Sequence, residues 1–481
     1  MLTRAHSFFP LAIFVLVLAT LVVSCTGEIE PIESDEAQQG NDRPNVIIVL
    51  ADDMGWGDAS SYGHPLIRTP HIDQLAAQGQ RWNSFYSAGP FCNPSRIALM
   101  TGRMPIRIQG TGLNQWGNLP EDEITLGQLF QDAGYVTGYV GKWGMSGRFE
   151  SGGVHPNDAG FDSFYGVEDY NDGYARDGLE NTYETLKNAT SEDFRMPLFR
   201  QKELIEQPAH QPTLTKRYTE EAVRFIEQQL ESEQSFFLFL GHTMPHVPIF
   251  ASEEFLGTSQ GGLYGDVIEE IDWSLGEIVR TLEEGGGDKN TLVIFTSDNG
   301  PWRTVYDLGG SAGPFRDGKM TAWEGAFRVP NIFWWPGTIE PSVAEGIGVG
   351  VDFMATLASL TPIELPRDRV LDSIDLSQTL LEGSPSARTE WFYYGQPGNL
   401  WAARVGSHKL VLESWESIGF EGGDVGWRGF ANRQVHDPPL LFDLSTDLGE
   451  RLDIADQQPM VVEAIQQTIE RYHASLVSGR P

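Results

Sequence analysis

Four short apolar runs constrain the fold of this chain more than any other feature of its sequence. They occupy residues 45–50 (NVIIVL), 135–140 (YVTGYV), 235–240 (SFFLFL) and 291–296 (TLVIFT). Continuous runs of this kind are typical of strands that are buried on both faces of a parallel sheet. Amphipathic segments lie between them, the clearest at 263–284, where apolar residues recur on one helical face. The sequence therefore predicts an α/β domain with a large, mixed but mostly parallel central sheet flanked by helices.

Polar side chains follow each of the four apolar runs. They are Asp52 and Asp53 after the first run, Lys142 after the second, His242 and His246 after the third, and Asp298 and Asn299 after the fourth. In open α/β sheets, sites form outside the carboxyl ends of the strands, so we expect these side chains to meet at one site. Taken alone, each of them is weak evidence for a site, and the Asp52-Asp53 pair is also compatible with a turn.

The acidic members of this set predict a metal site. Asp52, Asp53, Asp298 and Asn299 offer hard oxygen ligands, and their motifs contain no soft ligand. This selects Ca²⁺ or Mg²⁺ over zinc or copper, and Ca²⁺ is favoured because it tolerates irregular oxygen coordination. The alternative is that the acids only cap the helices that follow them.

The positive side chains near these motifs stand out against an acidic background. The chain has 33 Lys and Arg against 67 Asp and Glu, a net charge of −34, which argues against nucleic acid as a partner. Arg96, Lys142 and Lys319 favour a site for an anionic ester, although each of them is also compatible with a surface salt bridge. One of the two histidines His242 and His246 is a candidate general acid, and the other is expected to be structural.

The N-terminal segment predicts export and a lipid anchor. Arg4 and His6 precede an apolar run that is short for a membrane span, and the run ends at VVSC. This pattern resembles a bacterial lipoprotein signal of residues 1–25, in which Cys25 is lipidated; an ordinary signal peptide is the alternative. Residues 26–44 are acidic and without hydrophobic period, which predicts a flexible tether. We therefore expect an exported, periplasmic or cell-surface protein that meets the membrane only through its lipid anchor.

Cys92 is the second of the two cysteines of the chain. If Cys25 carries lipid, Cys92 has no partner for an intramolecular disulfide. A free thiol is a liability in an oxidising compartment, so Cys92 is either inert and buried or does not remain a thiol.

The remaining organisation comprises a catalytic domain over residues 45–384 and a smaller subdomain over residues 385–481. In the second, strand-like runs joined by turns precede a final helix near 459–476, which predicts an antiparallel sheet. The segment 146–212 carries no motif. Its aromatic residues are as compatible with packing as with stacking on sugar rings; they are Phe161, Tyr165, Tyr170 and Tyr174.

The segment CNPSR followed by TGR resembles the signature of the sulfatase family, within the alkaline-phosphatase-like superfamily. ADDMGWGD, VGKW, HTMPHVPIFAS, FTSDNG, GKMTAWEG and LFDLSTDLGERLDIA follow in the order of that family across residues 45–460. The match looks closest to the arylsulfatase A and N-acetylgalactosamine-6-sulfatase branch. The resemblance implies an alkaline-phosphatase-like fold and a calcium-dependent sulfuric ester hydrolase that acts on a sulfated carbohydrate or an aryl sulfate.

The resemblance also implies roles for single residues. Cys92 is expected to be converted to Cα-formylglycine by a formylglycine-generating maturation enzyme, and its hydrated aldehyde to attack sulfur, helped by Asp298. His246 would protonate the leaving alcohol with Lys319 beside the ester, while Arg96 and Lys142 would orient the modified residue. The implied metal ligands are Asp52, Asp53, Cys92, Asp298 and Asn299.

One position departs from the family pattern. Many members read Gly-Lys-Trp-His, whereas this chain has Gly144 in place of the histidine. His155 is a candidate replacement from the same loop; a slower enzyme or a rearranged pocket is the alternative. Two further hypotheses remain open at this point: a phosphonate monoester or phosphodiester hydrolase of the same superfamily, and a lipoprotein that binds sulfated glycans without cleaving them.

Overall fold

The computed structural model describes residues 43–109, 118–395, 398–417 and 433–478, which belong to one compact unit. The predicted signal peptide (1–25, with Cys25) lies outside the described residues, as does the predicted tether except for its last two residues. Among the helices in these described ranges, none is both long and apolar enough to span a bilayer.

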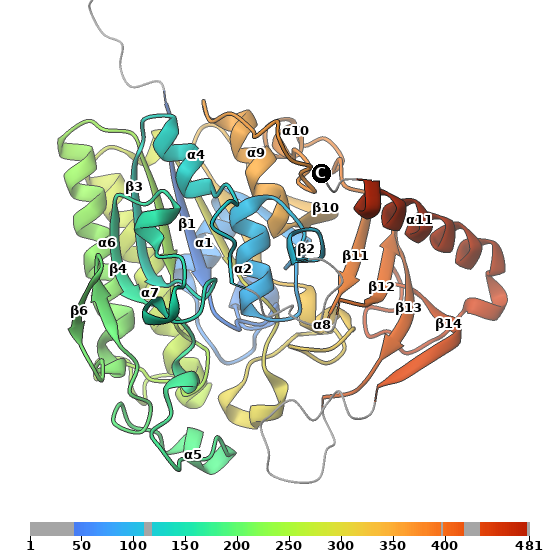
Figure 1. The fold of residues 1–481 in the computed structure, drawn as a ribbon, viewed down its shortest axis with the longest axis horizontal. Coiled ribbons are helices and arrows are strands. Elements are labelled where there is room, and N and C mark those ends of the chain that lie inside the picture. Colours follow the sequence, from blue (N-terminus) through green and yellow to red (C-terminus); the bar gives the residue numbers. More distant parts are fainter. Residues whose placement is uncertain (1–42, 110–117, 396–397, 418–432, 479–481) are drawn as a thin grey trace, which may run out of the picture. The chain divides into compact units, whose positions relative to one another are not determined.

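A ten-stranded mixed sheet forms the centre of this unit, in the order β10-β2-β9-β8-β1-β7-β3-β4-β5-β6 (Figure 1). Its strands are β1 (Asn45–Ala51), β2 (Gln80–Tyr86), β3 (Val136–Lys142), β4 (Ser163–Val167), β5 (Leu198–Arg200), β6 (Glu203–Glu206), β7 (Phe236–Gly241), β8 (Thr291–Ser297), β9 (Asn331–Trp334) and β10 (Ser342–Val349). The four predicted runs form β8, β1, β7 and β3, which are adjacent and mutually parallel. The predicted fold class is confirmed.

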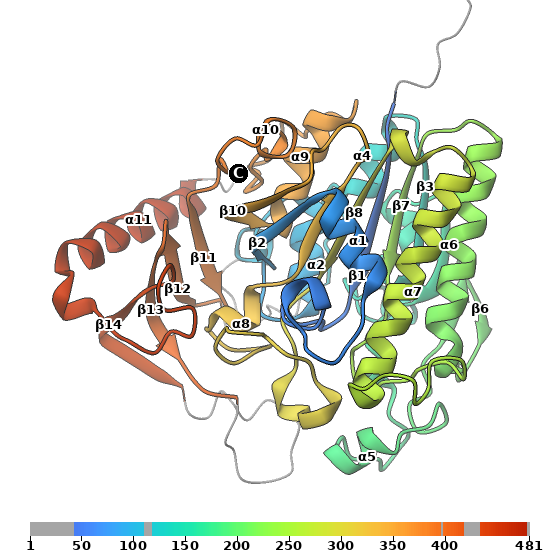
Figure 2. The same cartoon turned by 180° about the vertical axis from the view of Figure 1, so that it is seen from behind.

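Helices cover both faces of this sheet. The helices of this part of the chain are α1 (Pro70–Gln78), α2 (Cys92–Thr101), α3 (Pro105–Gln109), α4 (Leu126–Asp132), α5 (Tyr183–Lys187), α6 (Leu214–Glu231), α7 (Gly262–Glu284), α8 (Glu324–Phe327), α9 (Phe353–Leu360) and α10 (Ser377–Glu382). Figure 2 shows α1, α6 and α7 on one face, and Figure 1 shows α2 and α4 on the other. Ile47 and Val49 of β1 join the core on the first face, whereas Ile48 and Leu50 join the core on the second. Because alternate residues enter opposite cores, the whole strand is apolar.

The C-terminal part forms a second, antiparallel sheet, as predicted. It contains β11 (Glu390–Tyr394), β12 (Leu400–Val405), β13 (His408–Ser414) and β14 (Gln434–Asp443), and the final helix α11 (Pro459–Ser478) packs on it. Trp323, Phe327, Tyr393 and Trp401 share one buried cluster, so this sheet is joined to the larger one by a common apolar core. The boundary at 384/385 stays a prediction.

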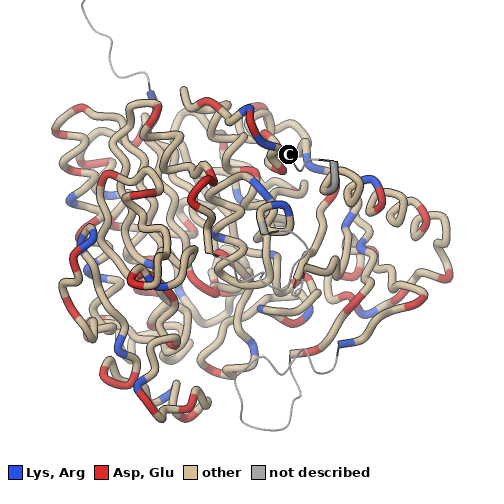
Figure 3. The backbone as a smooth tube through the Cα atoms, in the orientation of Figure 1, with Lys and Arg blue, Asp and Glu red and all other residues tan. Residues whose placement is uncertain are grey.

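Acidic residues are distributed along most of the chain, with Lys and Arg between them (Figure 3). Several surface acids pair with a neighbouring base, for example Glu221 with Arg200 and Asp158 with Lys202. The excess of 67 acids over 33 bases leaves many more without such a partner. A solvated acidic surface of this kind acts on solubility and association rather than on fold.

Three glycines lie in register across β4, β3 and β7 immediately before the polar end of the sheet. Gly141 pairs with Gly166 on one side and Gly241 on the other, and its φ is +100°. A Cβ at Gly141 would lie 1.9 Å from the carbonyl oxygen of Gly241. Only glycine therefore fits at this position, directly before Lys142.

We expect Gly141→Ala to destabilise the protein far more than Gly63→Ala. Both glycines have nearly the same φ, +100° and +98°, but a Cβ at Gly63 meets nothing within 4 Å. Gly63→Ala should therefore cost only the left-handed backbone strain, about 1–2 kcal/mol, whereas Gly141→Ala adds a backbone clash. Urea unfolding of both variants measures the difference. Equal losses of stability would show that the three strands separate at no cost.

Candidate active site

The carboxyl ends of the four central strands deliver buried polar side chains to one edge of the sheet. Asp52 and Asp53 follow β1, Lys142 ends β3, and Asp298 and Asn299 follow β8. His242 and His246 follow β7, and α2 adds Cys92 and Arg96 while the loop before α8 adds Lys319. All of these side chains are buried. Figure 1 shows β1 running toward the side of the sheet on which α5 lies.

Arg96 connects the acids of β1 and β8. Its Nε donates to Asp298 Oδ2 at 2.8 Å and its Nη1 donates to the carbonyl of Lys142 at 2.8 Å. Lys142 in turn pairs with Asp52. Burial raises the pKa of Asp298, and the neighbouring carboxylate of Asp52 adds to this effect. Two carboxylates held so close need nearby positive charge, which Arg96 and Lys142 provide.

Asp53 is the centre of a second group. Lys319 Nζ lies 2.7 and 2.8 Å from its two carboxylate oxygens, and Asn299 donates to Oδ1 at 2.7 Å. Asp53 itself has a φ of 71°, a conformation that is costly for a residue other than glycine and that clusters at functional sites. The Asp53 amide donates to Asp298 Oδ1 at 3.1 Å, so the strained residue is fixed between both groups.

His246 lies against Asp53 with a fixed ring orientation. Its Nε2 is 3.7 Å from Asp53 Oδ2, whereas Nδ1 is 2.8 Å from the carbonyl of Val247 and 3.0 Å from Asn171 Oδ1. Because both neighbours of Nδ1 are acceptors, Nδ1 carries the hydrogen. Burial, followed by the charge of Lys319, lowers the pKa of His246 to about 4. The imidazole is therefore neutral, with the free electron pair of Nε2 turned toward Asp53.

The donor atoms of this pocket fit a hard divalent cation. Ligand atoms of Asp52, Asp53 and His246 all lie within 4.8 Å of one another. Within the described residues, Asp52 Oδ1 and Asn299 Oδ1 are buried without a hydrogen-bond partner, which is costly unless something else binds them. Carboxylate and amide oxygens are the ligands that Ca²⁺ and Mg²⁺ prefer, and imidazole is not. The oxygens therefore fit the cation better than His246 does.

Cys92 begins α2 and is 7% exposed. Burial raises the pKa of its thiol to about 11, although Lys142 and Lys319 oppose the change. A neutral thiol is a poor nucleophile. Four residues further along the helix, Arg96 Nη2 is buried without a hydrogen-bond partner in the described chain and lies 3.6 Å from Asp52 Oδ2, so it can still donate to an added oxygen at this site.

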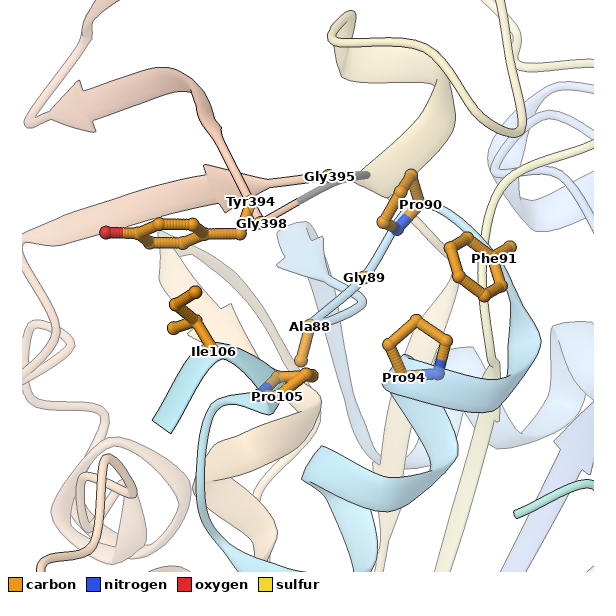
Figure 4. Close-up of a pocket in the computed structure, with 10 residues that line it drawn as sticks. All are labelled: Ala88, Gly89, Pro90, Phe91, Pro94, Pro105, Ile106, Tyr394, Gly395 and Gly398. Carbon is orange, nitrogen blue, oxygen red and sulfur yellow. The ribbon is translucent and has the colours of Figure 1, made fainter. Parts of the chain in front are cut away.

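A small pocket lies behind the start of α2 and does not include Cys92. Figure 4 shows Phe91 and Pro94 on one side of it and Tyr394 of β11 on another. Its lining is mostly apolar and comprises Ala88, Gly89, Pro90, Phe91, Pro94, Pro105, Ile106, Tyr394, Gly395 and Gly398. Among the described residues of this lining, Tyr394 is the one ionisable side chain, and burial raises its pKa. The described lining therefore lacks the acids and bases of the candidate active site.

The structure does not place His155 among the site side chains. Its Nε2 lies 3.0 Å from the carbonyl of Gln201, and its Nδ1 accepts the amide hydrogen of Asn157 as the cap of the short helix η3 (Pro156–Ala159). This corrects the expectation that His155 replaces the family histidine. At Gly144, φ is +67° and a Cβ would lie 3.0 Å from Lys142 Cε, so a side chain there would crowd the site.

His242 has a structural environment. It is fully buried, its Nε2 lies 3.3 Å from Ser274 Oγ of α7, and burial lowers its pKa to about 3. The histidine that faces the acids is His246. This is the division of roles that the sequence left open between the two.

The sequence interpretation missed Asn171 and Asp172. Asn171 orients His246 and also donates to the carbonyl of Pro248 at 2.8 Å, and Asp172 Oδ1 lies 3.9 Å from His246 Nδ1. Both belong to the short helix η4 (Asn171–Tyr174). No motif marks this loop, so only its contacts reveal it.

Comparisons with known proteins relate the whole described chain to sulfatases. Residues 44–363 match the sulfatase family, and residues 386–481 match the C-terminal region of aryl-sulfatase. An arylsulfatase of Hemicentrotus pulcherrimus is 36% identical over 476 residues, 94% of this chain and 85% of that protein. The N-acetylgalactosamine-6-sulfatase of Homo sapiens is 35% identical, over 91% of this chain and 87% of its own. The crystal structure of PsFucS1 sulfatase from Pseudoalteromonas sp. superimposes with a TM-score of 0.79 at 28% identity and covers 91% of each chain.

Proposed function

Because the chain belongs to the sulfatase family and is a sulfuric ester hydrolase, we propose that it removes sulfate from a saccharide, using a formylglycine made from Cys92 and a bound Ca²⁺. The observation that carries this proposal is the setting of Cys92. It lies at the head of a helix and interacts electrostatically with two lysines, Lys142 and Lys319, and two acids, Asp52 and Asp298. Burial raises the pKa of its thiol to about 11. A residue so placed is positioned as a nucleophile but is unreactive as a thiol.

The formylglycine and the Ca²⁺ ion would supply a nucleophile and a divalent positive charge, which the unmodified side chains do not provide. A formylglycine at residue 92 would supply a hydroxyl nucleophile, and Ca²⁺ held by Asp52, Asp53, Asp298 and Asn299 would neutralise sulfate oxygens. Arg96 and Lys142 fix the orientation of the acids through their contacts with Asp298 and Asp52.

The protein's own residues supply the leaving-group chemistry. Lys319 Nζ and His246 Nε2 both lie at Asp53, so an ester oxygen beside that carboxylate meets both. An anionic sulfate ester beside His246 favours the protonated ring, which can then donate to the departing alcohol. Lys319 stabilises the charge that develops on the same oxygen.

The proposal also covers maturation and location. Conversion of Cys92 requires a formylglycine-generating enzyme, and the sequence of residues 1–25 supports export with a lipid anchor at Cys25. The names of several relatives, N-acetylgalactosamine-6-sulfatases among them, support a saccharide ester as the substrate.

The test combines mass spectrometry with an activity assay on protein from its own host. We expect the peptide that contains residue 92 to have the mass of the aldehyde, and the protein to release sulfate from a sulfated monosaccharide. Cys92→Ala should abolish sulfate release and leave the unfolding midpoint close to that of the wild type. An intact thiol in active protein would rule out the proposed nucleophile.

Added Ca²⁺ is expected to stabilise the folded protein through this site. A ligand that binds only the native state raises stability by about 2.7 kcal/mol at a hundredfold excess over its dissociation constant, so the unfolding midpoint should rise in millimolar CaCl₂ relative to EDTA. Asp52→Asn should remove most of this rise. Asp266→Asn is the matched control, because Asp266 is also buried but accepts hydrogen bonds from Gly257 and Ser259 instead. If CaCl₂ raises the unfolding midpoint of Asp52→Asn as much as that of the wild type, the cation binds at another site.

A further inference from the structure

Two aromatic rings contact His246 from separate segments of the chain. The ring of Tyr170 lies 6.2 Å from the imidazole with an interplanar angle of 36°, and the ring of Trp302 lies 5.5 Å away at 58°. Tyr170 precedes η4, and Trp302 precedes the short helix η7 (Arg303–Leu308). Lys319 Nζ lies over the Trp302 ring at 4.6 Å. Trp302 therefore touches both side chains that face the ester oxygen.

Tyr170 is the exposed member of this group. Its residue is 42% exposed, whereas Phe161, Tyr165 and Tyr174 of the same segment are all buried. The four aromatics that the sequence could not distinguish thus separate into three packing residues and one ring that is open to a ligand. The phenol of Tyr170 also interacts electrostatically with Cys92 and Lys142. Together with the ring contact to His246, this places Tyr170 at the border of the candidate active site.

Asp169 places a carboxylate next to the exposed ring. Its Oδ1 accepts the amide hydrogen of Tyr170 at 2.9 Å, and in the part of the chain that the structure describes Oδ2 accepts no hydrogen bond. Its carboxyl interacts electrostatically with Lys142 and Asp52, and Asp169 directly precedes the ring that packs on His246. Burial raises the pKa of Asp169, and a hydroxyl donor would offset the cost of the lost hydration.

These contacts restrict which alcohol can serve as the leaving group of the sulfate ester. A group whose oxygen reaches His246 and Lys319 comes next to Trp302, which contacts both, and to the partly exposed ring of Tyr170, which contacts His246. A sugar ring presents a C–H face that packs on an aromatic ring and hydroxyls that donate to a carboxylate. We propose that Tyr170, Trp302 and Asp169 form the leaving-group subsite of this enzyme, and that it takes a saccharide ring with free hydroxyls next to the ester.

The charge of the subsite narrows the substrate further. Asp169 and Asp172 are both close to the ring position, and Asp172 is 12% exposed at its side chain. A second sulfate or a carboxylate on the same ring would face these acids and be repelled. The subsite therefore favours a monosulfated neutral or N-acetylated sugar over a disulfated ring.

The inference rests on the proposed sulfatase function. Two classes of substrate, saccharide sulfates and an aryl sulfate, distinguish failure of the subsite from failure of that function. On a panel of monosulfated monosaccharides, Asp169→Ala should lower kcat/KM by about 10- to 100-fold, the range for losing a hydrogen bond to a charged group. On 4-nitrophenyl sulfate, which has no hydroxyl to donate, Asp169→Ala should lower kcat/KM much less, because only the electrostatic effect of its carboxylate on the site is lost. Tyr170→Ala should raise KM on both classes, because either ring packs on the phenol, and Tyr170→Phe should restore both.

The controls distinguish the possible failures. Asp158→Ala removes an exposed acid that pairs with Lys202 and should change neither class. An Asp169→Ala variant with equal losses on both classes overturns the subsite alone. A wild-type protein that hydrolyses aryl sulfate but no saccharide sulfate overturns the subsite and the saccharide substrate of the proposed function, while its sulfatase activity stands. A wild-type protein that hydrolyses neither class overturns the proposed function, and the subsite with it. If Asp169→Ala unfolds, Asp169→Asn tests the same point, because it keeps the size and loses the charge.

Discussion

Lys409→Met is expected to lower the unfolding free energy by about 3–5 kcal/mol, the usual cost of removing one partner of a buried ion pair. Lys409 lies fully buried in β13, with Nζ 2.7 Å from Glu450 Oε1 and 3.1 Å from Glu324 Oε1. It also donates to the carbonyl of Ala322 at 2.9 Å. Without the ammonium group, two buried carboxylates would face each other with less positive charge between them.

The pKa directions at this cluster support the same expectation. Burial raises the pKa of Glu450 to about 7 despite the presence of Lys409. Burial also acts to raise the pKa of Glu324, but Lys409 and Arg328 outweigh it and hold that pKa low. Methionine at position 409 would remove the main opposing charge from both acids, so at least one of them should become protonated in the variant.

Lys202→Met is the matched control for this experiment. Lys202 pairs with Asp158 at 2.6 Å, but the two side chains are 60% and 56% exposed, and exposed ion pairs contribute little to stability. Thermal and urea unfolding should show a large shift for Lys409→Met and little for Lys202→Met. Adding Glu450→Gln to Lys409→Met should recover part of the loss. Similar small shifts in both variants would show that water reaches the cluster.

The central sheet and its polar edge could be predicted because both depend on local sequence. A strand that is buried on both faces must be apolar throughout, as β1 is. Where such a strand ends at a functional site, the residues that follow it must be polar. The positions of β2, β9 and β10 could not be predicted in this way. β9 pairs antiparallel with β8 and with β2, and nothing in its four residues specifies that place.

The site residues also divide into those that local sequence predicts and those that only tertiary contacts bring to the site. Asp52 and Asp298 follow recognisable strands, whereas Tyr170 and Asn171 reach His246 only because the chain after β4 folds back onto the loop after β7. His155 shows the converse error. Its sequence is compatible with a catalytic group, but its side chain caps a short helix, and capping uses the same nitrogen atoms as proton transfer. Such competition between local and catalytic roles is decided by tertiary contacts.

His246→Gln is expected to reduce kcat/KM on saccharide sulfates by about 10²–10⁴-fold, the usual contribution of general acid catalysis. The size of the loss should depend on the leaving group. A sugar alkoxide departs poorly without a proton, whereas 4-nitrophenolate departs readily, so the loss on 4-nitrophenyl sulfate should be much smaller. Glutamine keeps a polar group near Asp53 but cannot carry a proton to the departing oxygen.

Variants of His242 and Lys319 show whether the leaving-group dependence is specific to His246. His242→Gln alters a buried ring that contacts Ser274 of α7, so it should change both substrates by the same factor. Lys319 Nζ, which binds both oxygens of Asp53, is the competing donor. If Lys319→Met shows the leaving-group dependence and His246→Gln does not, the lysine delivers the proton and the neutral imidazole only positions the ester. If His246→Gln shows it, the sulfate charge must raise the pKa of His246 from its value of about 4, because only the protonated ring can donate from Nε2.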